Sequence, residues 1–172
     1  MQIMGDIKML IQTEINQIDN ILNVNKNGLI IAFSKSDEEK KNFILNIASN
    51  MAIKYNKSIA VLNSSISFRK FINECIKIQY ENISKVGLKD DLREFKNRLK
   101  DVTNSNILIN FASSYNINEL IEKCRYVKSN QNVELIVIDK IDTITEFKEM
   151  QADIFSKLKE LAVELKVCIV CV

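Results

Sequence analysis

The sequence contains no histidine, no proline and no tryptophan, and only three of its 172 residues are glycine. The missing histidine removes the commonest general base, together with histidine-based catalytic triads and histidine-ligated metal sites. No apolar run reaches the ~18 residues that a membrane-spanning helix requires, and we recognise no signal peptide. We therefore expect a cytoplasmic protein that makes no contact with a membrane.

The net charge is also low, because 24 basic and 22 acidic residues leave a value of +2. That value gives no argument for nucleic acid or a membrane surface as a partner. Basic residues do gather between positions 85 and 100, but acids lie among them, so we read a mixed helix surface with weak or no nucleic-acid binding. The basic members are Lys85, Lys89, Arg93, Lys96, Arg98 and Lys100, and the acids are Glu81, Asp90, Asp91, Glu94 and Asp101.

The four cysteines, Cys75, Cys124, Cys168 and Cys171, do not have the spacing of a disulfide framework. Cys168 and Cys171 form a C-x-x-C pair, but it lies inside the apolar run VCIVCV, which predicts a strand. Positions i and i+3 of a strand point to opposite faces of the sheet. We therefore predict buried structural thiols, without a metal or a redox role.

Apolar strand-like runs alternate with helix-like segments along the chain. Strands are predicted at 29–33, 58–63, 106–111, 133–139 and 167–172, and helices at 37–55, 67–80, 88–101, 117–129 and 149–165, with Asn116 as the cap of the fourth helix. Wholly apolar strands that alternate with helices predict one α/β domain with a parallel sheet covered on both faces. Ligands of such sheets bind outside the carboxyl ends of the strands.

The first 27 residues carry a separate pattern. Apolar side chains recur at helical spacing, at Ile3, Met4, Ile7, Leu10, Ile11, Ile15, Ile18, Ile21 and Leu22. This stripe predicts an amphipathic helix over residues 3–22, which Gly28 separates from the first strand. We expect residues 1–27 to form a linker helix and the segment that leads into the domain, and residues 28–172 to form the main domain.

Residues 29–48 (LIIAFSKSDEEKKNFILNIA) have the pattern of a strand, a phosphate-binding turn and a helix. A phosphate-binding turn needs glycines and bare backbone, but this one carries Asp37, Glu38 and Glu39. Ser36 and Glu39 fit a capping box, in which the serine accepts from a first-turn N–H and the glutamate reaches back to the cap. Acids in the first turn also suit the positive end of the helix dipole. We interpret these carboxylates as replacements for a bound phosphate.

Five segments in order resemble the ATPase domain of DnaB-type replicative helicases. They are INQIDNIL, LIIAFSKSDEEKKNFILNIASNMA, NILINFASSYNINELIEKCRYVK, ELIVIDKIDTI and IFSKLKELAVELKV, and together they span about residue 15 to residue 172. The resemblance implies a RecA-like three-layer sandwich with a mainly parallel five-strand sheet, truncated after the fifth strand.

The family's Walker A loop, G-x-x-x-x-G-K-[ST], uses glycine so that backbone N–H groups can wrap the phosphates, and a hydroxyl that ligates Mg²⁺. In register, Ser34 replaces the first small residue and Glu39 replaces the second glycine. Lys40 is kept, and Lys41 stands where the hydroxyl residue belongs. A negative charge ~4 Å from a phosphate oxygen costs ~4 kcal/mol at an effective dielectric constant of ~20. We therefore expect Glu39 alone to weaken nucleotide binding by ~10³-fold.

The resemblance places Ser65 at the position of the family's catalytic glutamate and Asp139 at the Walker B aspartate. Lys40, Lys41 and Asp139 would then be remnants of a nucleotide site. The family's polar sensor and arginine finger would lie beyond residue 172, and its DNA-contacting loop is cut to about TEFKE. Arg125 matches a recurrent arginine, for which we expect a structural role on backbone or a helix end, and Asp142 is predicted to be a solvated turn residue.

Two functions follow from this resemblance. In the first, the chain is a non-hydrolysing interaction module linked to DNA replication, without a cofactor or metal. Its partner would be a replicative helicase, another replication protein or a second copy, bound through Ile7, Ile11 and Ile18. In the second, the chain is a divergent helicase ATPase that still binds ATP with Mg²⁺. The residues at positions 39, 41 and 65 favour the first.

Overall fold

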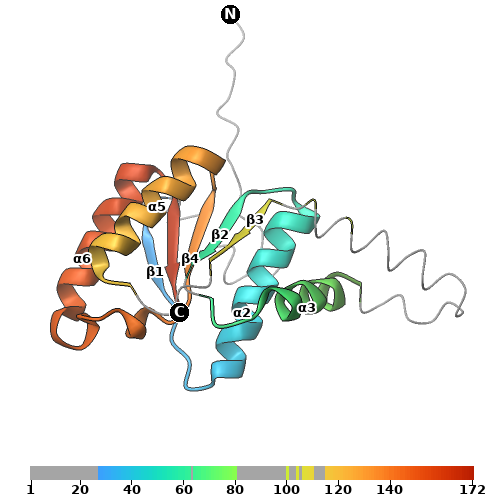
Figure 1. The fold of residues 1–172 in the computed structure, drawn as a ribbon, viewed down its shortest axis with the longest axis horizontal. Helices are drawn as coiled ribbons and strands as arrows, with labels where there is room; N and C mark the ends of the chain where they lie inside the picture. The colour runs from blue at the N-terminus through green and yellow to red at the C-terminus, as the bar shows by residue number, and fades with distance from the viewer. Residues whose placement is uncertain (1–26, 63, 81–99, 101–103, 105, 111–114) are drawn as a thin grey trace, which may run out of the picture.

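A computed structural model describes residues 27–62, 64–80, 100, 104, 106–110 and 115–172 (Figure 1). The strands are β1 (Leu29–Ile31), β2 (Ile59–Leu62), β3 (Ile107–Ile109), β4 (Leu135–Ile138) and β5 (Cys168–Cys171). The helices are α2 (Asp37–Ser49), the π-helical η1 (Asn50–Lys54), α3 (Phe68–Tyr80), α5 (Ile117–Gln131), the 3-10 turn η2 (Ile141–Thr143) and α6 (Phe147–Leu165). Two predicted features lie outside the described residues: the N-terminal stripe at 3–22 and the helix at 88–101 with its basic cluster. Lys100 alone of that cluster is described, and it is exposed.

The five strands form one sheet in the order β1-β5-β4-β2-β3, and every neighbouring pair is parallel. The prediction of a single parallel sheet is therefore confirmed. The order places β5 between β1 and β4, so the loop after β1 and the acid after β4 lie on either side of one strand. Within the described residues, β1 and β3 are the edge strands.

Helices cover both faces of the sheet, with α2 and α3 on one face and α5 and α6 on the other (Figure 1). Alternation along β2 divides its side chains between the two layers: Ile59 and Val61 pack under α2 and α3, while Ala60 and Leu62 pack under α5 and α6. Strands β2, β4 and β5 are buried at every position. This double burial explains why their sequences are almost wholly apolar.

Helix ends follow local chemistry. Asn116 caps α5 as predicted: its side chain accepts from the Glu119 N–H (2.9 Å), and the Glu119 carboxylate accepts from the Asn116 N–H (3.1 Å). The helix ends at Gln131, and its C-cap Asn132 adopts the left-handed conformation (φ 46°) that asparagine tolerates. Helix α6 begins at Phe147, two residues earlier than predicted, and is kinked at Met150 (φ −126°, ψ 27°).

All four cysteines are buried, as the sequence predicted. Cys168 lies in the layer under α2 and α3, whereas Cys171 lies in the layer under α5 and α6. The C-x-x-C pair is therefore divided by the sheet itself, which confirms the prediction from strand periodicity. None of the helices in the described part of the chain is long and apolar enough to cross a membrane.

Candidate functional site

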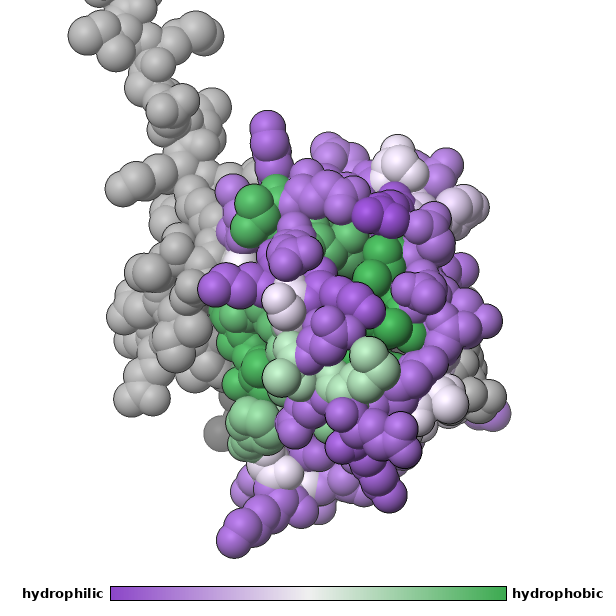
Figure 2. Space-filling view, turned by 90° about the vertical axis from the view of Figure 1, so that its left-hand side faces the viewer, coloured by the Kyte–Doolittle hydropathy of each residue, from purple (hydrophilic) through white to green (hydrophobic). Residues whose placement is uncertain are grey.

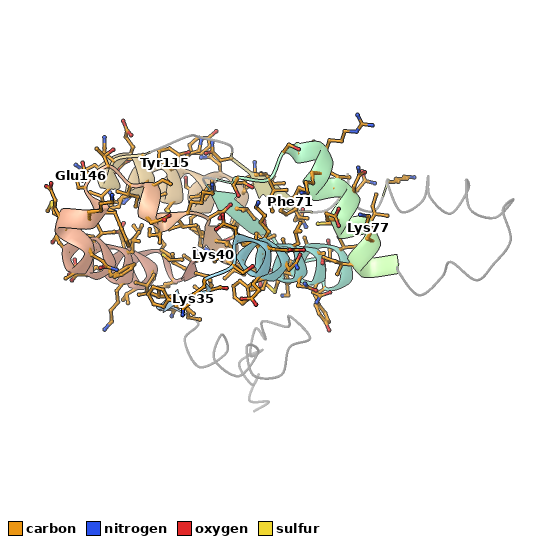
Figure 3. The ribbon with its side chains drawn as sticks, turned by 90° about the horizontal axis from the view of Figure 1, so that it is seen from below. Lys35, Lys40, Phe71, Lys77, Tyr115 and Glu146 are labelled. Carbon is orange, nitrogen blue, oxygen red and sulfur yellow. The ribbon has the colours of Figure 1, made fainter. Side chains whose placement is uncertain are left out.

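The residues singled out in the sequence meet at the carboxyl ends of the strands. The loop after β1 leads into α2, Ser65 follows β2, and Asp139 follows β4. A small hollow of about 140 Å³ lies between them, lined by Asp37, Lys40, Lys41, Ser65, Asp139, Lys140, Asp142 and Thr143. Figure 3 labels Lys40 near the start of α2 and Lys35 in the loop before it. The sequence-predicted remnants of a nucleotide site are thus brought together in space.

The loop after β1 is closed by its own side chains. Ser36 is the N-cap of α2, and its hydroxyl accepts from the Glu39 N–H (3.3 Å). The Ser36 N–H donates to the Ser34 hydroxyl oxygen (3.0 Å), and the Ser34 hydroxyl donates to the Glu39 carboxylate. The predicted bond from the Ser36 N–H directly to Glu39 is wrong. Ser34 Oγ lies between the two groups because a hydroxyl can accept one hydrogen bond and donate another.

This network uses N–H groups that a phosphate would otherwise bind. In a phosphate-binding loop, glycines leave successive N–H groups free to cradle the anion. Here the N–H groups of Ser36 and Glu39 bind serine hydroxyls, and the N–H of Lys40 donates to the Ser36 carbonyl (3.2 Å). Helix α2 already begins at Asp37, with three exposed acids in its first turn. The Glu39 carboxylate thus belongs to the acidic first turn of α2 and accepts from the Ser34 hydroxyl.

Asp139 is the most buried charged residue of the site, with 3% of its surface exposed. Its Oδ2 accepts two hydrogen bonds from Ser65, one from the N–H (2.8 Å) and one from the hydroxyl (2.9 Å). The Asp139 N–H in turn donates to the Leu62 carbonyl (2.9 Å). Ser65, which the sequence resemblance placed at the family's catalytic glutamate, thus connects the loop after β2 to the end of β4.

The sequence did not predict the contact between Ser65 and Asp139, which are separated by 74 positions. The available signal was that each residue lies shortly after the end of a buried strand. Because β2 and β4 are parallel neighbours, with Leu62 opposite Ile138, residues just beyond their carboxyl ends must lie close together. Choosing this neighbour pair requires the strand order, which the pattern of apolar runs does not contain.

Acidic and basic side chains are equal in number around the hollow. Asp37, Asp139 and Asp142 face the same space as Lys40, Lys41 and Lys140. Lys40 and Lys41 are half-buried, and neither ammonium forms an ion pair within the described residues. The hollow is also smaller than the ~300–1,000 Å³ of typical ligand pockets.

The side chains present do not fit a magnesium nucleotide. Lys41 offers no hydroxyl oxygen to a metal, and Oδ2 of Asp139 is already shared by two donors of Ser65. No group of three or more possible metal-ligating side chains occurs in the described part of the chain. We derive no chemical step through ATP or Mg²⁺ at this site.

Arg125 lies away from the hollow and has a different role from the one predicted. It binds two carboxylates, Glu122 on its own helix (2.7 Å) and Glu164 on α6 (2.9 Å), rather than backbone or a helix end. The hydrogen bonds with Glu164 and then Glu122 raise the pKa of Arg125, and the same bond to Arg125 lowers the pKa of Glu164. Arg125 therefore joins the two helices that cover one face of the sheet. Asp142 is exposed in η2, as predicted.

A second hollow, of about 260 Å³, lies beside the loop after β1 and was not predicted. Its lining includes the apolar residues Ala32, Phe33, Phe43 and Val172 and the polar residues Ser34, Glu39 and Lys40. Phe33 is 81% exposed, an unusual environment for a large aromatic side chain. On the side where α5 and α6 lie, by contrast, polar side chains break up the apolar surface (Figure 2).

A parallel sheet with a phosphate-loop equivalent after β1 and an acid after β4 defines the class of RecA-like domains with a P-loop-type fold. Solved structures bear out this class. One solved ATPase domain superposes with a TM-score of 0.72 at 16% identity, covering 94% of this chain and 62% of that one. A DnaB-like replicative helicase, from a structure describing its interactions with primase, gives a TM-score of 0.67 at 18% identity, covering 94% and 43%. At such identities the likeness establishes the fold.

The family follows from the sequence comparison. The family model described as DnaB-like helicase C terminal domain matches residues 11–172, and the chain belongs to that family. It is 25% identical over 157 residues to the replicative DNA helicase DnaC of Bacillus subtilis (strain 168) and 26% identical over 157 residues to the replicative DNA helicase DnaB of Geobacillus stearothermophilus. These alignments cover 84% of this chain and 35% of each relative, so the chain spans about a third of their length.

Proposed function

We propose that this chain is a DnaB-like RecA-fold domain that does not hydrolyse ATP and serves as an interaction module linked to DNA replication. The observation that carries the proposal is the closed loop after β1. Its N–H groups are bound by Ser34 and Ser36, and the Glu39 carboxylate, which accepts from the Ser34 hydroxyl, adds a negative charge to this loop. The bonds from Ser65 to Asp139 support it further, because a serine there supplies no carboxylate to activate a water.

Replication is the proposed setting because the matched relatives are replicative DNA helicases. One structural neighbour is a DnaB-like replicative helicase described with its interactions with primase. We propose a partner of the same kind for this chain, either a replication protein or a second copy. The predicted helix at 3–22 would dock through Ile7, Ile11 and Ile18, since so large an apolar stripe is rarely left in water.

The alternative function is a divergent ATPase that still binds ATP with Mg²⁺. It is favoured by one observation: Lys40 and Lys41 line the same hollow as Asp139, as a phosphate-binding lysine and a Walker B acid would. Against it stand the small volume of the hollow and its three carboxylates. The carboxylates repel a polyphosphate, and the hollow is smaller than the ~300–1,000 Å³ of typical ligand pockets.

Isothermal titration of the full chain with ATP and Mg²⁺ tests the proposal. We expect a dissociation constant weaker than ~1 mM, because Glu39 repels phosphate. A Glu39→Gly, Lys41→Thr variant should bind more tightly, since it restores the glycine and the hydroxyl. The matched control is Glu149→Gly, Lys148→Thr, which makes the same exchanges in the first turn of α6 and should leave binding unchanged.

Micromolar binding by the unmodified chain would contradict the proposal and support the divergent ATPase. Hydrolysis is measured separately by phosphate release. Turnover above background, with the same chain carrying Asp139→Asn as the blank, would show that Ser65 does not prevent catalysis.

A further inference from the structure

The joint between the N-terminal segment and β1 carries a reactive dipeptide. Of the three glycines in the chain, Gly28 alone follows an asparagine, Asn27. In such a pair, the backbone nitrogen of the second residue can attack the side-chain amide of the first. Any other residue in the second position hinders this approach with its Cβ, which glycine lacks.

The structure leaves both reacting groups available. Asn27 is exposed in a turn, and Gly28 is only half-buried. Within the described residues, neither the Asn27 side chain nor the Gly28 N–H forms a hydrogen bond. The Gly28 carbonyl, in contrast, accepts from the Ile169 N–H (3.0 Å). The peptide group after Gly28 is therefore held by the sheet, whereas the peptide group before it is not held by a hydrogen bond within the described residues.

Several other asparagines of the structure are restrained by side-chain hydrogen bonds. The Asn116 side chain is bound in the capping box of α5, with the Glu119 N–H at 2.9 Å. Asn106 donates to Asn56 across the amino ends of the strands (3.2 Å), and Asn110 accepts from the Tyr115 hydroxyl. Each bond must break before the amide can turn toward the following nitrogen. Asn27 has no such bond to break within the described part of the chain.

We propose that Asn27 is a site of spontaneous deamidation. The Gly28 backbone nitrogen gives its proton to hydroxide and attacks Cγ of Asn27, and the side-chain nitrogen leaves as ammonia. The product is a five-membered succinimide ring. Water then opens the ring at one of its two carbonyls, giving aspartate or isoaspartate. The net reaction consumes one water and releases one ammonia, without oxidation or reduction.

The modification changes the start of the sheet. Either product places a carboxylate directly before β1, and isoaspartate also adds a methylene to the main chain. That methylene falls next to Gly28, whose carbonyl holds Ile169 of β5. Since β5 is the one partner of β1 within the described sheet, the isoaspartate form should have a loosened start of β1.

The test uses the full chain, incubated at physiological temperature in mildly alkaline buffer and sampled by peptide mapping with mass spectrometry. We expect the peptide containing Asn27 to gain the mass of an NH₂-to-OH exchange before any other asparagine peptide does. Hydrogen exchange should show a faster amide at Ile169 in the modified fraction. The proposal does not depend on whether the chain binds a nucleotide.

Two variants serve as controls. Gly28→Ala should slow the reaction several-fold without disturbing the fold, because no glycine of the described residues has a positive φ. Asn27→Gln should abolish the fast phase, since ring closure through glutamine is slower. Loss of Asn27 in urea together with its persistence in the folded chain would overturn the proposal, as would earlier deamidation at another asparagine.

Discussion

At the scale of single residues, serine and glutamate side chains close the loop between β1 and α2. Ser34 and Ser36 take up N–H groups at the start of α2, and Glu39 supplies the negative charge. A helix N-terminus favours an anion whether it comes from a ligand or from the chain itself. We therefore expect Glu39 to stabilise the start of α2 and to disfavour a bound phosphate.

Replacing Ser36 with alanine should lower the free energy of unfolding by ~1 kcal/mol, because the first turn of α2 loses its capping oxygen. Urea unfolding followed by circular dichroism measures the change. Ser156→Ala is the matched control, since Ser156 is exposed in the middle of α6 and caps nothing. An equal unfolding midpoint for the Ser36→Ala variant and the unmodified chain would show that the cap contributes no stability.

At the scale of elements, the two apolar layers on either side of the sheet contain the four cysteine thiols. Cys168 and Cys171 of β5 are fully buried on opposite faces, and Cys75 and Cys124 pack against the same faces from α3 and α5. Burial raises the pKa of Cys75, Cys124 and Cys168 from 9.0 to about 12, and it raises the pKa of Cys171 as well. At a pH between these two pKa values, the folded chain keeps the thiols protonated and the unfolded chain does not.

The stability of the fold should accordingly fall in alkaline solution. Between pH 9.0 and about 12 the unfolded chain loses thiol protons that the folded chain keeps, so the free energy of unfolding decreases as pH rises through this range. Urea titrations at several pH values measure the slope. A Cys75→Ala, Cys124→Ala variant should show a shallower slope despite lower stability at neutral pH. An unchanged slope would contradict a contribution from these two thiols.

At the scale of the whole molecule, two features favour association with another chain. In the described sheet, β1 has a partner on one side only, and open strand edges recruit partners. The exposed Phe33 lies just beyond the end of that strand. Together with the apolar stripe predicted for residues 3–22, these features favour a bound state over an isolated domain.

We therefore expect light scattering to show self-association of the full chain. Ile7→Asp, Ile11→Asp and Ile18→Asp together should shift the population toward monomer, because charge on the apolar stripe must be desolvated on docking. Thr13→Asp, Asn16→Asp and Asn20→Asp add the same charge to the polar side of the predicted helix and serve as the control. A strictly monomeric unmodified chain would exclude a second copy and leave another replication protein as the partner.

Much of the fold was predictable because burial requires a recognisable pattern of apolar residues within each segment of the sequence. A strand covered on both faces must be apolar at every position, so LIVI and CIVC indicated strands of a sheet covered on both faces before any partner was known. The cap at Asn116 was likewise predictable, since its bonds to Glu119 span three residues. The placement of Cys168 and Cys171 on opposite faces followed from the two-residue period of a strand.

The sequence by itself thus determined the alternation of strands and helices, the double-sided burial of the sheet and the acids at the start of α2. Only the tertiary structure decided that Ser65 binds Asp139 and that Arg125 binds Glu164. The physical reason is the separation along the sequence between the residues that interact. Apolar periodicity depends on neighbours along the chain, whereas a polar side chain takes the partner that strand order and helix packing bring within ~3 Å.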